Sequence, residues 1–161
     1  SSSHGSNSIT QKACICCLAG PTGSGKKTLM QAMAYDLGRA VKMVHVADLM
    51  TDSTSNTVAL LQTMITDARL ADAVVAIDGF EHIMEDSGGG EGTWKLHLLL
   101  SRMLEVLHRF PGCVVLIIHI DNPQNINLQR DFAVKLFCFL RIPVPPHDIR
   151  AKLWAKLMPV G

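Results

Sequence analysis

A run of glycines followed by lysine is the part of the sequence best suited to chemistry. Residues 19–28 read A-G-P-T-G-S-G-K-K-T, in which Gly20, Gly25 and Lys26 fit the pattern G-x-x-x-x-G-K. In this pattern glycines let backbone N–H groups point inward at phosphate oxygens, and the lysine adds positive charge. We therefore expect a phosphate-binding loop here. Its candidate residues are Gly20, Pro21, Thr22, Gly23, Ser24, Gly25, Lys26, Lys27 and Thr28.

The position after Lys26 departs from this pattern. It should hold Ser or Thr, whose hydroxyl ligates Mg²⁺, but Lys27 stands there and Thr28 comes one residue late. One residue along a helix turns a side chain by about 100°, so Thr28 is not expected to reach the metal. A second ammonium group beside the phosphates would repel Mg²⁺ and replace part of its charge. The sequence therefore puts Mg²⁺ binding in doubt.

Asp78 is a second candidate for phosphate chemistry. It closes the apolar run A-V-V-A-I-D, the arrangement of a Walker B strand whose carboxylate holds the water shell of Mg²⁺. An aspartate at the end of a buried strand is also commonly a turn or cap residue. The glycine loop upstream favours the Walker B interpretation, so Asp78 is the candidate metal-holding residue.

The cysteines offer a further possible chemistry. Each lies in an apolar, strand-like run, where cysteine is usually a small core residue. The five are Cys14, Cys16, Cys17, Cys113 and Cys138. The first three are close enough in sequence to suggest a metal cluster, but adjacent residues on a strand point to opposite faces. No metal site is expected from those three.

The composition fits one globular domain that would position these residues. The chain has 161 residues, 48% of them apolar, and its formal net charge of +1 gives no electrostatic footprint for nucleic acid or an anionic membrane. The apolar runs are too short to span a bilayer, and no signal peptide is visible. We therefore expect an intracellular protein, cytoplasmic by default. Serine-rich residues 1–11 are expected to be a disordered tail or an expression remnant, and 12–161 the domain.

Apolar runs typical of strands alternate with segments of helical periodicity. Strands are predicted over 13–18, 41–46, 73–78, 113–120 and 136–142. Helices are predicted over 26–37, from Ser55 as a cap to 70, over 94–110 and over 148–158. This alternation indicates a five-stranded parallel sheet with helices on both faces. Ligands of such sheets bind at the carboxyl ends of the strands, where the glycine loop, Asp78 and Asp121 lie.

The order of these motifs resembles the large α/β subdomain of a AAA-family ATPase, over about residues 12–158. G-P-T-G-S-G-K-K-T-L is similar to the family's Walker A, A-I-D-G-F-E-H-I to its Walker B and V-V-L-I-I-H-I-D-N-P to its sensor 1 strand. Residues 131–154 are similar to the stretch with the arginine fingers and a P-x-P-x-x-x-x-R helix. The resemblance implies a P-loop NTPase fold that binds ATP or ADP and assembles with other AAA subunits, as in a hexameric ring.

The residues that the resemblance assigns to catalysis depart from the family pattern. The glutamate that polarises the attacking water should follow Asp78, where Gly79 stands; Glu81 lies farther along the same loop. Asp121 aligns with the sensor 1 asparagine, and its charge beside a γ-phosphate is unfavourable unless it is protonated or paired. A shift of one residue offers Asn122 instead. The catalytic candidates are therefore Asp78, Glu81, Asp121 and Asn122.

Other family features are also altered. Val134 and Lys135 stand where an arginine finger is implied, and lysine lacks the planar fork of arginine. Residues 52–55 replace the aromatic turn with which threading members of the family grip polypeptides. The sequence ends at Gly161, near the point where the family's helical lid begins, so we do not expect the lid within these residues.

Three functions are compatible with these features. General acid–base assistance is worth about 10²- to 10⁴-fold and an arginine finger about 10³- to 10⁵-fold, so their loss leaves little hydrolysis, while Lys26 and the loop amides still bind. The first function is thus a nucleotide-binding module that hydrolyses weakly or not at all and is a structural or regulatory subunit of a ring. The second is an active ATPase that remodels a protein partner with Thr28, Glu81 and Asn122 in displaced roles. The third is a nucleotide-free interaction scaffold.

Charge balance also suggests a contact within the empty site. Two lysines and two carboxylates converge there, so we expect Lys27 to pair with Asp78 or Asp121 and thereby exclude Mg²⁺. His82 and His119 lie near the site only through the resemblance. Neither is expected to touch a ligand directly.

Overall fold

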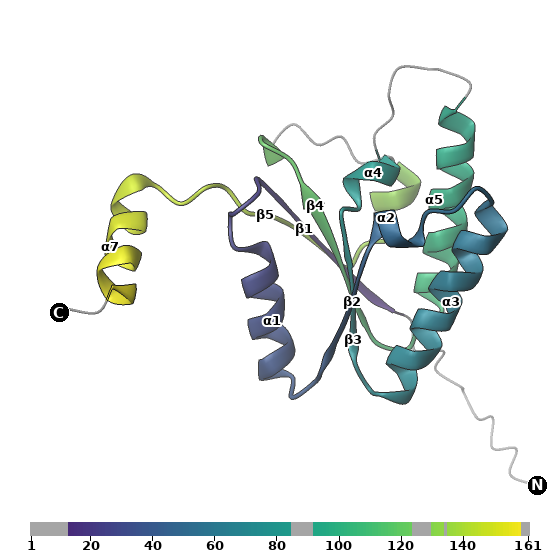
Figure 1. Ribbon diagram of the computed structural model, residues 1–161, viewed down its shortest axis with the longest axis horizontal. Helices are drawn as coiled ribbons and strands as arrows, with labels where there is room; N and C mark the ends of the chain where they lie inside the picture. Colours follow the sequence, from purple (N-terminus) through teal and green to yellow (C-terminus); the bar gives the residue numbers. More distant parts are fainter. Residues whose placement is uncertain (1–12, 85–91, 124–129, 134, 159–161) are drawn as a thin grey trace, which may run out of the picture.

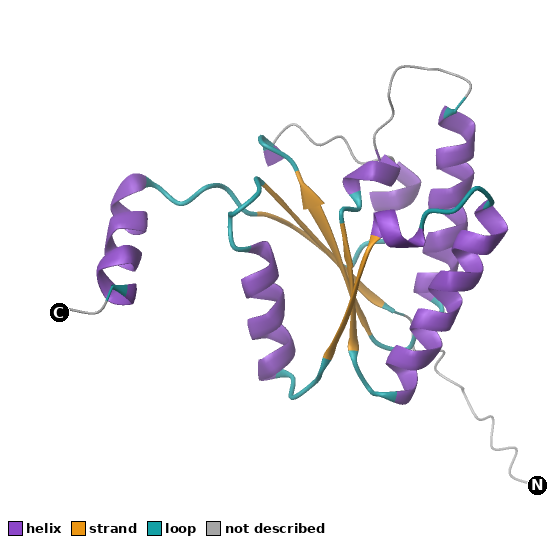
Figure 2. Cartoon of the chain, in the orientation of Figure 1, coloured by secondary structure: helices purple, strands orange, loops and turns teal. Residues whose placement is uncertain are grey.

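The computed structural model describes residues 13–84, 92–123, 130–133 and 135–158. Its strands form one parallel sheet in the order β2-β3-β4-β1-β5 (Figure 1 and Figure 2). The strands are β1 (Cys14–Gly20), β2 (Val41–His45), β3 (Val74–Asp78), β4 (Cys113–His119) and β5 (Cys138–Arg141). The predicted α/β fold with five parallel strands is therefore confirmed. The predicted strand ends differ from the observed ends by no more than two residues.

Helices cover both faces of the sheet, but unequally (Figure 1). They are α1 (Lys26–Asp36), α2 (Val46–Leu49), α3 (Thr54–Leu70), α4 (Glu81–Met84), α5 (Thr93–His108), α6 (Arg130–Ala133) and α7 (His147–Leu157). Helices α3 and α5 lie on one face and α1 on the other, while α7 stands apart beyond α1 and buries no residue. No helix in the described parts of the chain is long and apolar enough to cross a membrane.

The sheet divides the core into two unequal clusters. Ile15 and Cys17 of β1 face α5, where they join a large cluster that includes Leu107. Leu18 points to the other face and packs with Met30 of α1 in a much smaller cluster. Successive strand residues alternate between faces, so both clusters draw on the same strands. The face under α1 is the more thinly covered of the two.

Helix α3 begins earlier than the sequence predicts. Ser55 was the expected cap, but it lies inside the helix and Ser53 occupies the N-cap position. The Thr57 hydroxyl accepts a hydrogen bond from the Thr51 N–H, and the two hydroxyl oxygens lie 3.1 Å apart. These bonds join the preceding turn to the first turn of the helix, which moves its start to Thr54.

The carboxyl ends of the three central strands lie at one edge of the sheet. There β1 ends at Gly20, β3 at Asp78 and β4 at His119. Because β4 lies between β1 and β3, the loop after β1 faces the ends of both other strands. The fold thus brings the glycine loop and Asp78 to the same place, as the sequence predicts.

Candidate functional site

The loop between β1 and α1 has backbone conformations that favour glycine. Gly23 and Gly25 have φ angles of +78° and +91°, a region in which residues with a Cβ are strained. A Cβ at Gly20 would collide with the backbone carbonyl oxygen of Ile142, which follows β5. Gly25 is also the N-cap residue of α1. The loop therefore runs directly into a helix N-terminus, whose N–H groups and dipole favour an anion.

Lys26 is buried within this loop and bonded to it. Its Nζ donates to the carbonyl oxygens of Gly20 at 2.7 Å and Pro21 at 2.5 Å, and lies 3.3 Å from Ser24 Oγ. The residue is only 3% exposed. Burial lowers the pKa of Lys26, although the negative charges of Asp78 and Glu81 oppose this effect. The ammonium group is thus held at the centre of the loop by the loop's own oxygens.

A cavity of about 300 Å³ is lined mainly by this loop. Its volume lies at the lower end of the range for small-molecule sites, about 300–1,000 Å³. The lining residues are Thr22, Gly23, Gly25, Lys26, Lys27, Thr28 and His119. His119 comes from the end of β4, so the cavity lies between the loop and the facing strand ends. Thr28 borders this cavity even though the sequence predicts that it cannot reach a metal.

The Lys27 side chain forms an ion pair with Asp78 across this space. Lys27 Nζ lies 2.7 Å from Asp78 Oδ2, and the Asp78 side chain is only 7% exposed. The other oxygen, Oδ1, accepts a hydrogen bond from the Gly79 N–H at 2.9 Å and lies 2.6 Å from His119 Nε2. The expected pairing of Lys27 is therefore confirmed for Asp78. Both oxygens of the candidate metal-holding carboxylate are occupied by groups of the protein.

Opposing effects act on the protonation of Asp78. Burial raises its pKa and is the largest single effect, because it disfavours the charged carboxylate. Hydrogen bonds from Lys27 and His119, together with electrostatic attraction, outweigh burial, so the pKa of Asp78 lies below its usual value. Asp78 is accordingly a carboxylate at neutral pH, neutralised locally by Lys27.

His119 and Glu81 join the ends of β3 and β4. The Glu81 Oε2 atom accepts a hydrogen bond from the His119 backbone N–H at 3.1 Å, and the Glu81 side chain is 16% exposed. The ring of His119 borders the cavity and contacts Asp78, as described above. The sequence predicts no direct role for His119. His119 ends the strand beside the one that ends at Asp78, and this position indicates a contact between them. The inference requires knowing that β3 and β4 are neighbours.

Gly79 stands where the resemblance implies a catalytic glutamate, and its backbone conformation and surroundings disfavour a side chain. Its φ angle is +72°. A Cβ built there would lie 2.6 Å from atoms of the His45 ring. Real Cβ contacts of this length do not occur without movement of a neighbour. The backbone and His45 together therefore favour glycine at this position.

The remaining predicted residues lie farther from the cavity. Asp121 and Asn122 follow β4, are exposed, and are not among the residues that line the cavity. Lys135 is half-buried, just before β5. Val134 and the predicted tail of residues 1–11 lie outside the described residues. The site that the structure brings together thus consists of the loop, Asp78, Glu81 and His119.

A glycine loop between a central parallel strand and a helix, with an aspartate at the end of another strand facing it, defines the P-loop NTPase class. Within this class, residues 16–130 match the family model described as "ATPase family associated with various cellular activities (AAA)". This match covers more than half of the chain, so the chain belongs to the AAA family. The resemblance noted in the sequence is therefore confirmed.

A solved structure supports the same fold. The crystal structure of the FIGL-1 AAA domain in complex with ADP superposes with a TM-score of 0.65 at 18% sequence identity. The match covers 89% of this chain and 47% of that one, so this chain spans about half the length of its structural relative. A comparison with curated protein sequences finds no match.

Proposed function

We propose that this chain is a AAA-type nucleotide-binding module with weak or lost ATP hydrolysis, acting as a structural or regulatory subunit of a ring assembly. Binding is assigned to the loop from Gly20 to Thr28. Its ligand is ATP or ADP. The proposal separates two abilities that active members of the family combine, phosphate binding and phosphate cleavage.

The Lys27–Asp78 ion pair carries this proposal. Lys27 follows Lys26, where the pattern requires the hydroxyl that ligates Mg²⁺, and its Nζ lies 2.7 Å from the carboxylate expected to hold the metal's water shell. Lysine at position 27 therefore has two effects. It removes the hydroxyl that would ligate Mg²⁺, and it neutralises Asp78, the carboxylate that would hold the water shell of the metal. A Mg²⁺ ion would have to displace Lys27 from Asp78 before it could be held there.

Phosphate binding does not depend on that ion pair. Lys26, the glycine conformations and the α1 N-terminus all lie on the loop side of the cavity. The AAA-family match and the ADP-bound state of the FIGL-1 domain support a nucleotide as the ligand. A phosphate chain would bring negative charge toward Lys26 and Lys27, so the second lysine would supply part of the charge that Mg²⁺ usually provides.

The residues around Asp78 support weak hydrolysis. Gly79 offers no carboxylate to polarise water, and a side chain at this position would require the His45 ring to move. Glu81, the nearest alternative, already accepts the His119 N–H through Oε2. Acid–base assistance is commonly worth about 10²- to 10⁴-fold in rate, so its loss alone lowers turnover by that order.

Calorimetry with and without Mg²⁺, together with phosphate release, tests the proposal. We expect ATP to bind with an affinity that changes less than about threefold when Mg²⁺ is replaced by a chelator, and phosphate release no faster than in the Lys26→Ala protein. The experiment should include the protein in its ring or with partner subunits wherever these can be isolated. Strongly Mg²⁺-dependent binding with Lys26-dependent turnover would instead identify an active ATPase.

A nucleotide-free scaffold is the second candidate, and one observation favours it. Lys26 already donates to the carbonyl oxygens of Gly20 and Pro21, and Lys27 already pairs with Asp78. The cations of the loop are thus satisfied by the protein itself. Absence of any thermal shift with ATP or ADP, at concentrations that stabilise a control AAA domain, would identify this function.

A further inference from the structure

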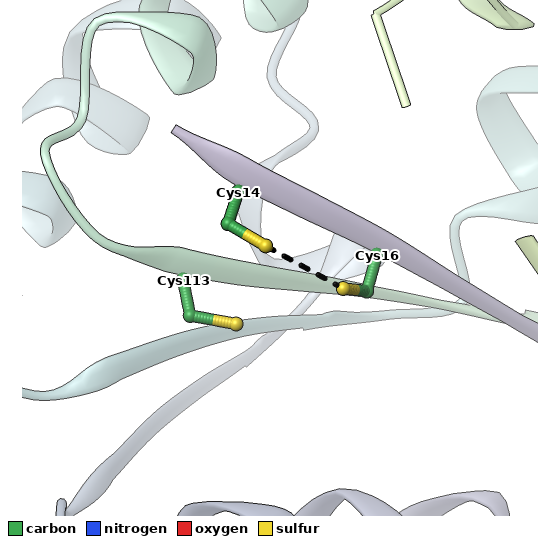
Figure 3. Close-up of side chains that lie close together, drawn as sticks. All are labelled: Cys14, Cys16 and Cys113. Atoms are coloured by element: carbon green, nitrogen blue, oxygen red, sulfur yellow. Dashed lines mark hydrogen bonds between the residues drawn. The ribbon is translucent and has the colours of Figure 1, made fainter. Parts of the chain in front are cut away.

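Thiol groups from different strands gather at the amino-terminal end of the sheet, far from the glycine loop along β1. Cys14 and Cys16 lie on β1, two residues apart, so their side chains share one face. Cys113 begins β4 and pairs in register with Cys14. Figure 3 shows the three side chains pointing into the same space. Cys17, which the sequence argument grouped with Cys14 and Cys16, points to the opposite face and belongs to the larger core cluster.

The sulfur atoms of Cys14, Cys16 and Cys113 are near the spacing of metal ligands. The Sγ atoms of Cys14 and Cys16 lie 3.9 Å apart. All three Sγ atoms lie within 4.8 Å of one another. Thiolates at about 2.3 Å from a tetrahedral Zn²⁺ ion are about 3.8 Å from each other. Small side-chain rotations are therefore enough to bring the three sulfurs to a common ion.

A fourth thiol lies next to Cys16. Cys138 of β5 pairs in register with Cys16 of β1, which places both residues on the same face of the sheet. The pKa of Cys16 is raised, first by its hydrogen bond to Cys113, then by burial and by a hydrogen bond to Cys138. Three adjacent strands, β4, β1 and β5, thus contribute cysteines to one face, but among the described residues only the Sγ atoms of Cys14, Cys16 and Cys113 all lie within 4.8 Å of one another.

We propose that Cys14, Cys16 and Cys113 form a binding site for a soft, thiol-binding metal ion of the Zn²⁺ type, with a water molecule as the fourth ligand. Each thiol releases its proton to solvent as its sulfur binds the ion. The site is structural: it ties the start of β1 to the start of β4 on the thinly covered face of the sheet. It is separate from the glycine loop and does not depend on the proposed nucleotide function.

The exposure of the cysteines is compatible with such a site. Cys16 is 5% exposed, whereas Cys14 and Cys113 are partly exposed and leave a path for an ion. The thiolate is the form of cysteine that binds metal.

This cluster cannot be seen from neighbours along the chain. Cys113 is distant from Cys14 in sequence and becomes its neighbour only through the pairing of β1 with β4. Four of the five cysteines share one face for the same reason, since in-register residues of adjacent parallel strands point the same way. The signal was present in the spacing of Cys14 and Cys16, once Cys17 is set aside.

Titration of the reduced full chain with Co²⁺ alone, followed by competition with Zn²⁺ alone, tests the site. We expect one Co²⁺ per chain, with thiolate charge-transfer bands in the near ultraviolet and visible bands of tetrahedral coordination, all abolished by Zn²⁺. Cys113→Ala and Cys14→Ala should each weaken binding at least tenfold. The matched control is Cys17→Ala, which removes a thiol from the same strand but from the opposite face and should bind as the wild type does.

Three results would overturn the proposal. One is the absence of thiolate-to-Co²⁺ bands in the reduced wild type. Another is an equal loss of binding in Cys17→Ala and Cys113→Ala. The third is a disulfide among Cys14, Cys16 and Cys113 that peptide mass spectrometry finds in the protein as purified, with no metal bound after reduction. Circular dichroism of each variant without metal checks that it is folded, and Zn²⁺ should raise the melting temperature of the wild type and of Cys17→Ala only.

Discussion

The two sides of the cavity differ in how much of the AAA machinery they retain. On the loop side, Gly23 and Gly25 adopt the left-handed conformations of a phosphate loop, and Lys26 lies at its centre. On the side of the strand ends, Asp78 is held by Lys27 and His119, and Gly79 replaces the expected glutamate. The loop side is therefore suited to holding phosphate, whereas the strand side is occupied by its own ion pair.

This difference shows that binding and cleavage depend on separable parts of the fold. The phosphate loop is made by one continuous segment, so its geometry survives as long as the glycines do. Cleavage depends on side chains from several strands, each of which can be lost alone. Lys27 connects the two sides, because it belongs to the loop in sequence and pairs with Asp78 in space.

Restoring the missing glutamate should have the largest effect, and it should be harmful. Gly79→Glu places a Cβ at a φ of +72° against the His45 ring, so we expect a loss of about 2–4 kcal/mol in the free energy of unfolding. Turnover should not rise. Urea unfolding measures the loss, and adding His45→Ala should recover part of it. Faster phosphate release from Gly79→Glu with unchanged stability would show that the strand side can still support hydrolysis once the glutamate is present.

Removing the central lysine should damage the loop side. We expect Lys26→Ala to weaken ATP binding by about 10- to 100-fold, because it removes charge-assisted hydrogen bonds worth about 1.5–3 kcal/mol. Calorimetry measures the dissociation constants. Lys95→Ala, on α5, is the matched control for loss of one positive charge and should bind as the wild type does. Equal affinities of wild type and Lys26→Ala would assign nucleotide binding to another site.

Replacing Lys27 should bring the two sides closer to the family pattern. Lys27→Thr supplies the missing hydroxyl and releases Asp78, so Mg²⁺ should tighten ATP binding about tenfold in the variant and hardly at all in the wild type. Titrations with MgCl₂ and with a chelator give the two affinities. Lys42→Thr, on the exposed part of β2, serves as control. An equally large effect of Mg²⁺ on the wild type would contradict the role given to the ion pair.

Acid should weaken the strand side by a smaller amount. The pKa of Asp78 is lower in the folded protein than its usual value of about 4, so the ion pair stabilises the fold above pH 4 and this contribution is lost as the pH falls through the lowered pKa. Lys27 is half exposed, so we expect only about 1 kcal/mol. Urea unfolding between pH 7 and pH 3 measures it. Asp78→Asn should lack this part of the pH dependence, and an identical profile would contradict the assignment.

Sequence alone was sufficient for the fold and for the loop. Apolar runs and glycine positions are local signals, and they located every strand to within two residues. The pairing of Lys27 with a carboxylate was also predictable, because Walker A and Walker B motifs meet in any sheet of this kind. The choice of Asp78 over Asp121 required the structure, in which Asp78 closes β3 and Asp121 is exposed beyond β4.

Features that arise between strands were not predictable in the same way. His119 and the thiol cluster of Cys14, Cys16 and Cys113 depend on which strands are neighbours and on their register. The short helices α2, α4 and α6 were missed because four residues carry no detectable periodicity. The sequence predicts Ser55 as the N-cap of α3, whereas Ser53 is the N-cap, because the Thr51–Thr57 contact crosses the helix boundary.

The bonds of Lys26 to its own loop have a consequence for which ligands the loop selects. Its Nζ already donates to the carbonyl oxygens of Gly20 and Pro21, so the loop acts as an internal competitor for the ammonium group. The free energy that an incoming anion gains from Lys26 is its attraction to the ammonium group minus the attraction of the two carbonyl groups that it displaces. A single sulfate ion should therefore fail to draw Lys26 away from these carbonyl oxygens. A polyphosphate, with more charges near Lys26 and Lys27, should succeed.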